Sequence, residues 1–579
     1  MYRSKNRLGG KASTLGVIVD WLGDPYQATV CDGIEQGASH AGANLLIFVG
    51  GALPVQPGAA VARHKVYDLA GRHNLDGLVV LSSTLSHEVG PAAVRAFCEQ
   101  FVGLPVCSVG LPLEQMPSVT IDNEAGMGAV VRHLLEQHSA RRIAFISGPA
   151  VNAESQIRER AYHALLEQHG IPTEEHCVFT GTFLMDSGAQ AVRSLTKRFG
   201  SRLEQLDAIV AANDNMAIGA MDELMRMGVS VPDAIAVVGF DDIEEARLTE
   251  PSLTTARQPL TRIGTEAVRR VLQEAGKGEG ELDLRSISTE LVVRHSCGCS
   301  ALGLRSRSPI VNKQRFQLAL MGQRERILAQ LGRAARGRFS AAGADWEQLI
   351  VNALVEDLVA GESGRFLPAA ERLVQRLGAR GVDLNAVDEV LSALREEMVP
   401  LLTSEPDKHR HAEDLFHAVR LSTSAALQRG AGRAHLTLSR WARTIAVVCN
   451  ALAAAVDYAD LGARLRRHLP KLGLRSCFVS VYEPGGDASQ ARLIASCDGS
   501  GAAASCEGRT FRARELLPPE LANADGEGRS FAVLPLTGLS EVIGHVLFEY
   551  TAQHAFACGA LAEAMSIAIR NTMASAAAP

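Results

Sequence analysis

The sequence predicts an α/β fold with two lobes, each a parallel sheet covered by helices on both faces. A helical region and a small α+β domain follow them. Three observations support this prediction. Short runs that are apolar throughout recur from Leu15 to about Thr255, stretches with apolar residues at helical spacing separate them, and the composition changes past Cys299. Strands that are apolar throughout and alternate with helices are typical of parallel sheets buried on both sides.

The apolar runs are too numerous for one mononucleotide-type half, so we expect two consecutive lobes. The first lobe covers about 15–121 plus a returning segment after 257, and the second covers about 122–256. The later run "TELVVRHSC" returns to complete a two-lobed core over 15–300. The eight runs on which these boundaries depend are 15–20, 44–51, 76–82, 105–110, 118–123, 142–149, 207–214 and 235–242.

Outside this core the pattern predicts four further segments. Residues 1–14 form a basic, disordered arm, and 301–312 form a linker. Residues 313–438 have apolar residues at helical spacing and few strand candidates, which indicates a helical relay region. Residues 439–575 contain sheet-like runs such as "CFVSVYE" and "EVIGHVLFEY" and end in a helix, which indicates a small α+β domain.

The bulk composition is that of a soluble globular protein. Its 579 residues are 47% hydrophobic and 21% charged, and the net charge of −6 favours neither nucleic acid nor a membrane as a partner of the whole chain. The 11 cysteines have no framework spacing, which favours a reducing compartment. The start lacks the apolar core of a signal peptide, and no window is long and apolar enough for a membrane helix, so we expect a cytoplasmic protein.

Polar and aromatic residues follow several of the predicted strands. In open parallel sheets, ligands bind beyond the carboxyl ends of the strands. Carboxylates and amides pair with hydroxyl groups, and an aromatic face covers the apolar side of a ring, so the sequence predicts a site for a small polyhydroxylated ligand. The candidate ligand-binding residues are Asp20, Trp21, Tyr26, Ser82, Asn213 and Asp241.

The stretch "VVGFDDIEEARL" places four acids directly after a strand, and each allows a structural interpretation. Asp242, like Asp214, could cap the helix that follows it, and Glu244 and Glu245 could complement a helix dipole. A metal site would need several converging ligands, and only adjacent acids are visible. A catalytic pair would need a nucleophile or substrate frame, which the sequence does not offer. We therefore predict no catalytic residue, no metal and no cofactor.

Two stretches carry a family resemblance. "SVTIDNEAGMGAVVRHLLEQHSARRIAFISGP" and "AANDNMAIGAMDELMRMGVSVPDAIAVVGFDDIEEARLTEPSLTTARQPLTRIG" resemble the ligand-binding core of the lactose-repressor/galactose-repressor (LacI/GalR) family, and the match covers about residues 14–299. The resemblance implies a periplasmic-binding-protein-like pair of lobes that closes on a small molecule, often a sugar or a nucleobase.

The resemblance also implies roles for three positions. The family's ligand-contacting arginine matches Arg158, its asparagine in the "AND" turn matches Asn213, and its aspartate after the "VVGF" strand matches Asp241. Ala161 stands where the family usually has glycine. The family's helix-turn-helix headpiece has no counterpart, because residues 1–14 are too few for a packed three-helix DNA reader.

The ending "ELVVRHSCGC" resembles a narrower group in which such a core is fused to bacterial signalling outputs. Cys297 and Cys299 could form a metal or redox pair, but no second Cys or His pair is nearby in the sequence, so we interpret them as small residues that end the core. Residues 439–575 weakly resemble a GAF-like sensor or dimerisation module. No kinase, cyclase or phosphate-loop motif is visible.

Residues 305–338 contain nine Lys or Arg and one acid, Glu325. This run could be a nucleic-acid arm, but it has no nucleic-acid reading motif, so a solvated helical face fits it better.

The sequence therefore favours a non-enzymatic, cytoplasmic sensor of a small polar ligand, active as a homodimer through a separate signalling partner. The alternative is a LacI-family transcription regulator with an unrecognised or lost DNA-binding element, so DNA binding stays open. A third possibility, an enzyme that uses the cleft, lacks a reactive group. No membrane partner is expected.

Overall fold

The computed structural model describes residues 13–577 with internal gaps, and the predicted linker at 301–312 lies outside the described residues, as does nearly all of the predicted arm at 1–14. Among the described residues, no helix is long and apolar enough to cross a membrane. The gaps are 54–62, 173–176, 277–285, 300–315, 340–342, 344, 361–363, 381, 403–404, 484–488, 499–501, 523–528, 539–540 and 552–553.

The chain divides into two compact units. Residues 1–302 and 444–579 form the first unit, and residues 303–443 form the second. The division between them at Arg443 and Thr444 falls inside one long helix, α15 (Pro406–Ala453).

The first lobe is a parallel sheet with strand order β2-β1-β3-β4-β5. Its long helices α1 and α10 pack so closely that a Cβ added at Gly33 would lie 2.2 Å from the Thr261 carbonyl oxygen. The elements are β1 (Thr14–Val19), α1 (Pro25–His40), β2 (Asn44–Val49), β3 (Gly77–Val80), α3 (Ser82–Leu85), α4 (Pro91–Glu99), β4 (Val106–Val109), β5 (Ser118–Val119) and α10 (Leu260–Glu274).

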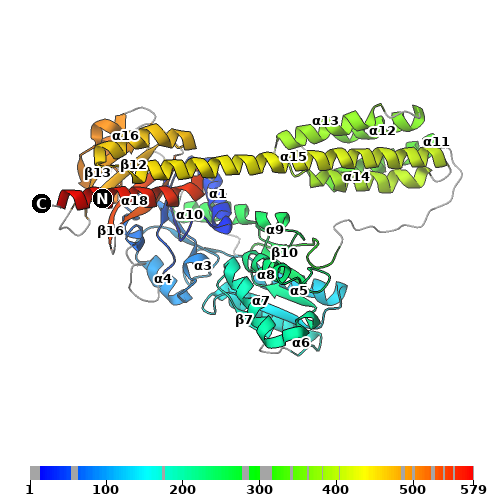
Figure 1. Cartoon of the computed structure of the whole chain (residues 1–579), viewed down its shortest axis with the longest axis horizontal. Helices are drawn as coiled ribbons and strands as arrows, with labels where there is room; N and C mark the ends of the chain where they lie inside the picture. The colour runs from blue at the N-terminus through cyan, green and yellow to red at the C-terminus, as the bar shows by residue number, and fades with distance from the viewer. Residues whose placement is uncertain are drawn as a thin grey trace. The chain divides into compact units, whose positions relative to one another are not determined.

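The second lobe has strand order β11-β10-β9-β8-β6-β7, parallel except for the edge strand β11, which runs antiparallel to β10. Figure 1 shows its helices packed around the sheet. Its elements are α5 (Asn123–Gln137), β6 (Ile143–Ser147), α6 (Ala153–Gln168), β7 (Val178–Thr180), α7 (Met185–Phe199), β8 (Ala208–Ala211), α8 (Asp214–Arg226), β9 (Ala236–Asp241), α9 (Glu244–Leu248), β10 (Thr254–Arg257) and β11 (Glu290–Val292).

The chain passes between the two lobes more than once. It enters the second lobe after β5, returns to the first after β10 to form α10, and enters the second again to form β11. A parallel bridge between Ile121 and Ile287 joins two of these crossing segments. The predicted fold class, two α/β lobes of the periplasmic-binding-protein type, is confirmed.

The C-terminal strands extend the sheet of the first lobe. β15 pairs in parallel with β2, with Phe531 opposite Leu46, and the result is a ten-stranded sheet of order β14-β13-β12-β16-β15-β2-β1-β3-β4-β5. The Leu45 amide donates to the Arg529 carbonyl oxygen over 2.8 Å. The added elements are α16 (Tyr458–His468), β12 (Cys477–Tyr482), β13 (Gln490–Cys497), β14 (Thr510–Arg512), α17 (Pro519–Ala522), β15 (Ser530–Thr537), β16 (Val542–Glu549) and α18 (Ala555–Ala577).

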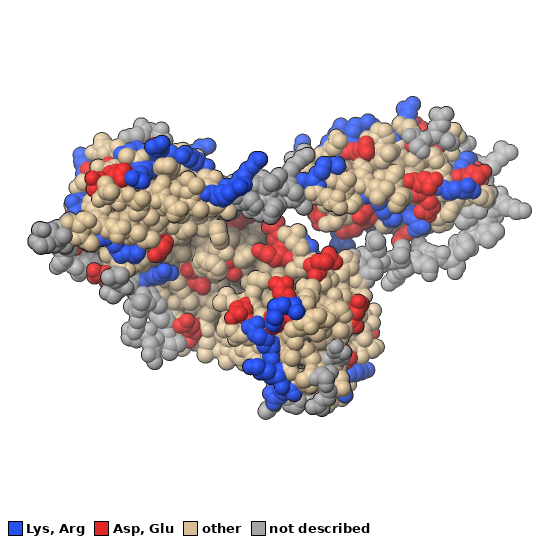
Figure 2. Space-filling view, in the orientation of Figure 1, with Lys and Arg blue, Asp and Glu red and all other residues tan. Residues whose placement is uncertain are grey.

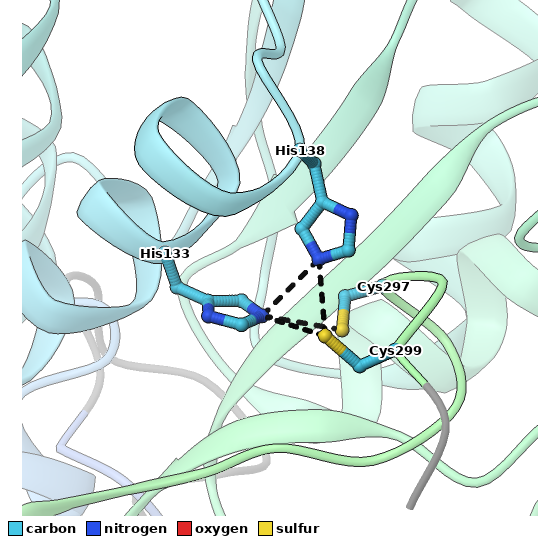
Figure 3. A group of neighbouring side chains, drawn as sticks. All are labelled: His133, His138, Cys297 and Cys299. Carbon is cyan, nitrogen blue, oxygen red and sulfur yellow. Dashed lines mark hydrogen bonds between the residues drawn. The ribbon is translucent and has the colours of Figure 1, made fainter. Parts of the chain in front are cut away.

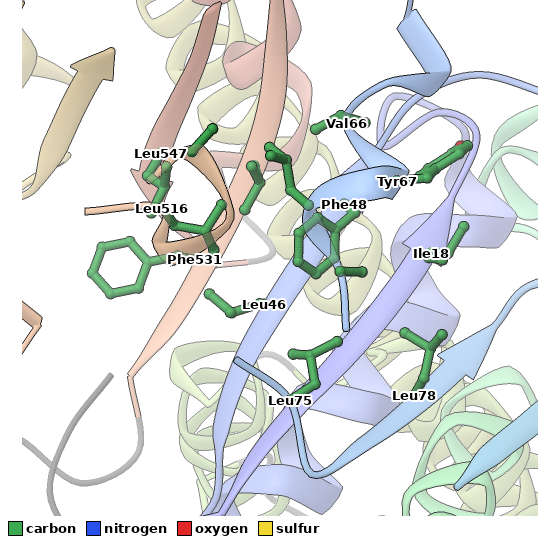
Figure 4. Packing of buried hydrophobic residues seen from close by; sticks show 14 of the residues in the cluster. Ile18, Leu46, Phe48, Val66, Tyr67, Leu75, Leu78, Leu516, Phe531 and Leu547 are labelled. Atoms are coloured by element: carbon green, nitrogen blue, oxygen red, sulfur yellow. The ribbon is translucent and has the colours of Figure 1, made fainter. Parts of the chain in front are cut away.

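One hydrophobic core runs across this junction, as Figure 4 shows. Ile18 and Phe48 from the first lobe share it with Phe531 and Leu547 from the C-terminal strands, and all four are almost fully buried. The segment that the sequence predicts as an end domain therefore shares both a sheet and a core with the ligand-binding lobe. The GAF likeness of this segment stays a prediction.

The second unit is helical over its described residues, and it has its own core, which includes Ile327, Phe366 and Phe416. Two arginines of the basic run 305–338 form ion pairs within this unit: Arg326 pairs with Glu397 and Arg338 with Glu389. Figure 2 shows basic and acidic side chains interspersed on this unit. The helices are α11 (Phe316–Ala335), α12 (Trp346–Ala360), α13 (Phe366–Ala379), α14 (Asn385–Met398) and the first part of α15.

Candidate functional site

A cavity with about 660 Å³ of empty space, part of it open to solvent, lies between the two lobes of the first unit. Strand ends and helix starts of both lobes line it, together with one residue from a crossing segment. The lining residues are Asp20, Trp21, Asp24, Tyr26, Gln27, Ser83, Thr84, His87, Asn152, Glu154, Arg158, Phe183, Leu184, Asn213, Asn215, Asp241 and Gln258.

The wall from the first lobe begins directly after β1. Asp20 is the residue after that strand, and its Oδ1 is buried without a hydrogen-bond partner among the described residues. Burial raises the pKa of this carboxyl, and the hydrogen bond from Gln27 partly offsets the effect. A buried acceptor with no partner is costly, so a ligand hydroxyl that donated to Asp20 would be favoured. Trp21 and Tyr26 lie beside it, and Trp21 is 54% exposed.

Arg158, on α6, is the central cation of the wall from the second lobe and is only 3% exposed. Its guanidinium donates from Nε to Asn123 Oδ1 and from Nη1 to the Ala212 carbonyl oxygen, each over 2.7 Å. It lies 3.9 Å from the centre of the Phe240 ring. These contacts fix the guanidinium in one orientation at the cavity wall.

Asp241 ends β9 and is 6% exposed. Its Oδ1 accepts from Gln258 Nε2 over 2.6 Å and lies 3.7 Å from Arg158 Nη1. Burial raises the pKa of Asp241, and the nearby Arg158 works against that rise. The Oε1 atom of Gln258 is a second buried acceptor without a partner among the described residues. The two lobes and the crossing segment thus each bring an acceptor to the cavity.

Asn213 lines the cavity, but its side chain also has a structural role. Its Oδ1 accepts from the Met216 amide and caps α8, and its Nδ2 donates to the Phe183 carbonyl oxygen over 3.0 Å. Both polar atoms of this amide are therefore already in use in the structure.

Ser82 is the one candidate residue that the structure does not bring to the cavity. It is fully buried, and its Oγ accepts from Ser108 Oγ over 2.8 Å. Its neighbour Ser83 lines the cavity instead. Helix α3 begins at Ser82, and at its start the side chain of Ser83, not that of Ser82, lies at the cavity.

Two other acids near the end of β9, Asp242 and Asp214, are buried and have partners of their own. The Asp242 carboxylate forms ion pairs with three arginines. Its oxygens lie 2.6 Å from Arg257 Nε, 2.5 Å from Arg294 Nη2 and 3.5 Å from Arg247 Nη2. Asp214 accepts from the Ile243 amide and from Thr255 Oγ1. Neither acid caps a helix, because Ile243 is the N-cap of α9 and Asn213 that of α8.

Glu244 and Glu245 differ from these buried acids. They are exposed and stand in the first turn of α9, which agrees with the helix-dipole interpretation. They do not line the cavity.

Sequence reasoning missed several lining residues. Asn152 caps α6 and donates from Nδ2 to the Ser83 carbonyl oxygen over 3.1 Å, which links the two lobes. Glu154, 7% exposed, accepts from Asn123 Nδ2 and lies 3.9 Å from Arg158. The "GPAVNAES" stretch also follows a predicted strand, so the position of both residues beyond the carboxyl end of that strand is the signal that indicates them.

The arrangement is suited to binding. Carboxylate and amide oxygens can accept from hydroxyl groups, a buried guanidinium can donate, and the rings of Trp21 and Phe183 offer apolar faces. A small molecule with several hydroxyl groups would use each of these features.

Comparison with known proteins identifies the relatives of this fold. A family model described as a periplasmic binding protein-like domain matches residues 131–297. The "HTH-type transcriptional regulator GalR" of Salmonella typhimurium is 30% identical over 283 residues, which are 49% of this chain and 78% of that protein. The "HTH-type transcriptional regulator CelR" of Thermobifida fusca is 32% identical over 278 residues, which are 47% of this chain and 76% of that protein.

Two solved structures are similar to about half of the chain. One is a sugar-binding transcriptional regulator of the LacI family from Escherichia coli complexed with phosphate; it is 27% identical with a TM-score of 0.41, and the match covers 49% of this chain and 99% of that one. Another is the complex of the transcriptional regulator CelR with cellobiose, 28% identical with a TM-score of 0.43, with 50% of this chain and 86% of that one covered.

Proposed function

The chain belongs to the LacI/GalR family through its ligand-binding core, and from this premise we propose that it is a ligand-responsive transcription regulator. Its effector is a small polar molecule of the sugar or nucleoside class, bound between the two lobes. The observation that carries the proposal is the cavity in which both lobes and a crossing segment present buried, hydrogen-bonding side chains. The protein acts by binding, without catalysis.

The relatives favour regulation of transcription over the signalling role that the sequence favours. GalR and CelR are both named transcriptional regulators, whereas the sequence alone points first to a separate signalling partner. GalR and CelR come from bacteria, whose DNA lies in the cytoplasm, and repressor-type cores commonly pair, so we propose a cytoplasmic homodimer. The element that contacts DNA is not assigned.

Ligand binding in the cavity would couple the two lobes. Asp20 belongs to the first lobe and Arg158 and Asp241 to the second, so one ligand that contacts all three stabilises the arrangement in which the lobes face each other. A ligand shifts such an equilibrium only by its difference in affinity for the two states. Contacts to both lobes provide that difference.

A signalling output through a partner protein is the second candidate. It is favoured by the helical unit at 303–443, which has its own core and lies outside the 131–297 range of the family match. The arginines of this unit that pair with Glu397 and Glu389 are also less available to phosphate groups.

The first experiment is a thermal-shift screen of the full chain against monosaccharides, disaccharides and nucleosides. A ligand at a hundred times its dissociation constant stabilises the folded state by about 2.7 kcal/mol. We expect at least one compound to raise the melting temperature of the wild type and to have a much smaller effect on Asp241→Ala. If compounds of these classes change neither protein, the effector class is wrong.

A second experiment separates the two outputs. Genomic DNA fragments are tested for binding with and without the compound found in the screen. Transcription regulation predicts specific binding that responds to the compound and weakens steeply as salt rises. Binding to no fragment under either condition would favour the signalling partner.

A further inference from the structure

Two histidines and two cysteines of the second lobe come together, and none of the four lines the cavity between the lobes. His133 lies on α5 and His138 directly after it, while Cys297 and Cys299 follow β11. One ligand atom from each of the four side chains lies within 4.8 Å of every other. Figure 3 shows the two imidazoles and the two thiols turned toward a common centre.

The separations fit a tetrahedral metal ion. The two imidazole Nε2 atoms are 3.3 Å apart, and Cys299 Sγ lies 3.5 Å from His133 Nε2 and 3.3 Å from His138 Nε2. Cys297 Sγ lies 3.4 Å from His133 Nε2. Zinc bound to two His and two Cys by its usual bond lengths would place N and N about 3.3 Å apart and N and S about 3.6 Å apart.

Local backbone geometry supports the convergence. Gly298, between the two cysteines, has φ +98°, a conformation that residues with a side chain rarely adopt. This turn directs both thiols to the same side. A Cβ at position 298 would also lie 3.6 Å from His138 Cε1, so the imidazole packs directly over the turn.

We propose that His133, His138, Cys297 and Cys299 form a binding site for a zinc ion. Two neutral imidazoles and two thiolates are a donor set typical of structural zinc sites. Binding releases the two thiol protons to solvent, and two thiolates neutralise the charge of the ion. The ion would hold the segment after β11 against the end of α5.

The sequence hides this site because its two halves are about 160 residues apart. From the sequence alone a metal at Cys297 and Cys299 is not expected, because no second pair of Cys or His residues is nearby in the chain. The fold supplies that pair from α5, since β11 lies at the edge of the second lobe beside β10, next to which α5 packs.

The test uses the reduced full-length chain, stripped of metal with a chelator and titrated with Co²⁺, which substitutes for zinc and gives visible thiolate charge-transfer bands. We expect one equivalent of Co²⁺ per chain, full displacement by one equivalent of Zn²⁺, and a higher melting temperature with either ion. Cys299→Ser and His138→Ala should each lose the thiolate band or the tetrahedral spectrum at equimolar Co²⁺, and Zn²⁺ should no longer stabilise them.

Two matched variants serve as controls. His295→Ala removes an exposed imidazole from the same loop, and Cys449→Ser removes a thiol on α15, and both should bind Co²⁺ as the wild type does. Metal-free wild type and Cys299→Ser should melt at similar temperatures, which separates lost binding from lost folding. The proposal is wrong if the wild type takes up no Co²⁺, or if both cluster variants bind it unchanged.

Discussion

At the scale of single residues, the expectation that ligands bind beyond the carboxyl ends of parallel strands predicted much of the cavity wall. Asp20, Trp21 and Asp241 each stand at or directly after the end of a buried strand, and they face one cavity because the carboxyl ends of parallel strands meet at one edge. Ser82 shows the limit of this expectation. The backbone conformation at the start of α3 determines whether Ser82 or Ser83 lies at the cavity. Both residues are serines, so their residue type does not show which one it is.

Two of the three arginines around Asp242 could not be predicted from the sequence. Arg257 and Arg294 are 15 and 52 residues away in the sequence, and only the pairing of β9, β10 and β11 brings them to one carboxylate. Spacing along the chain does not show such long-range ion pairs.

Asp20→Asn should weaken ligand binding without loss of fold stability. The substitution keeps the size of the side chain and removes a buried carboxylate whose Oδ1 has no partner among the described residues. Hydrogen bonds to a charged group contribute about 1.5–3 kcal/mol, so we expect the dissociation constant to rise by about tenfold to more than a hundredfold. Calorimetric titration with the compound from the screen measures the change.

The control for Asp20→Asn is Glu244→Ala, an exposed acid outside the cavity. Its affinity should match that of the wild type, and its stability should differ by at most about 1 kcal/mol. Equal losses of affinity in both variants would mean that the cavity does not bind the compound.

Asp214 should make the stability of the core depend on pH. Burial raises the pKa of this carboxyl to about 7, against the hydrogen bonds from Thr255 and the Ile243 amide, which lower it. The folded state therefore holds this proton at a pH where the unfolded chain has lost it, and the free energy of unfolding should fall as pH rises from about 4 to 7, by at most about 1.4 kcal/mol per pH unit.

Denaturant unfolding at several pH values measures this effect, with Asp214→Asn as the comparison. The variant cannot titrate at this position, so its stability should fall less between about pH 4 and 7 than that of the wild type. The same slope in both proteins would assign the pH dependence to another group.

At the scale of elements, the sequence predicted the helices and strands of the core better than their partners. The apolar runs at 44–51 and at "SFAVLPL" both read as strands, and both form them, as β2 and β15. Their pairing with each other joins segments nearly 500 residues apart. A strand that is apolar on both faces is predicted to be buried, but its sequence does not indicate which strand it pairs with.

Phe531→Ala should destabilise the ligand-binding lobe together with the C-terminal strands. The side chain is 4% exposed and lies in the core that both segments share, with its ring 6.2 Å from that of Phe478. Loss of a buried phenylalanine costs about 3–5 kcal/mol. We expect the thermal transition that the ligand shifts to move to a lower temperature.

Phe556→Ala is the matched control, because Phe556 on α18 is 65% exposed. It should leave that transition within about 0.5 kcal/mol of the wild type. An unchanged ligand-sensitive transition in Phe531→Ala would show that the C-terminal strands and the first lobe unfold independently.

At the scale of the whole molecule, the chain joins a family core to two additions. The core supplies the cavity, the C-terminal strands extend its first sheet, and residues 303–443, whose described part is helical, form a unit of their own. The central claim is that a small polar ligand binds between the two lobes. Trp21 can report on this directly, because it is one of only three tryptophans in the chain and lines the cavity.

The most direct measurement is a fluorescence titration of the wild type and of Trp21→Phe with the compound from the screen. We predict a saturable change in tryptophan emission of the wild type that is absent in Trp21→Phe, although calorimetry should still detect binding to that variant. Asp241→Ala should require at least about tenfold more compound to reach the same change. A compound that binds the wild type but leaves the emission of Trp21 unchanged, or changes emission equally in Trp21→Phe, would contradict binding between the lobes.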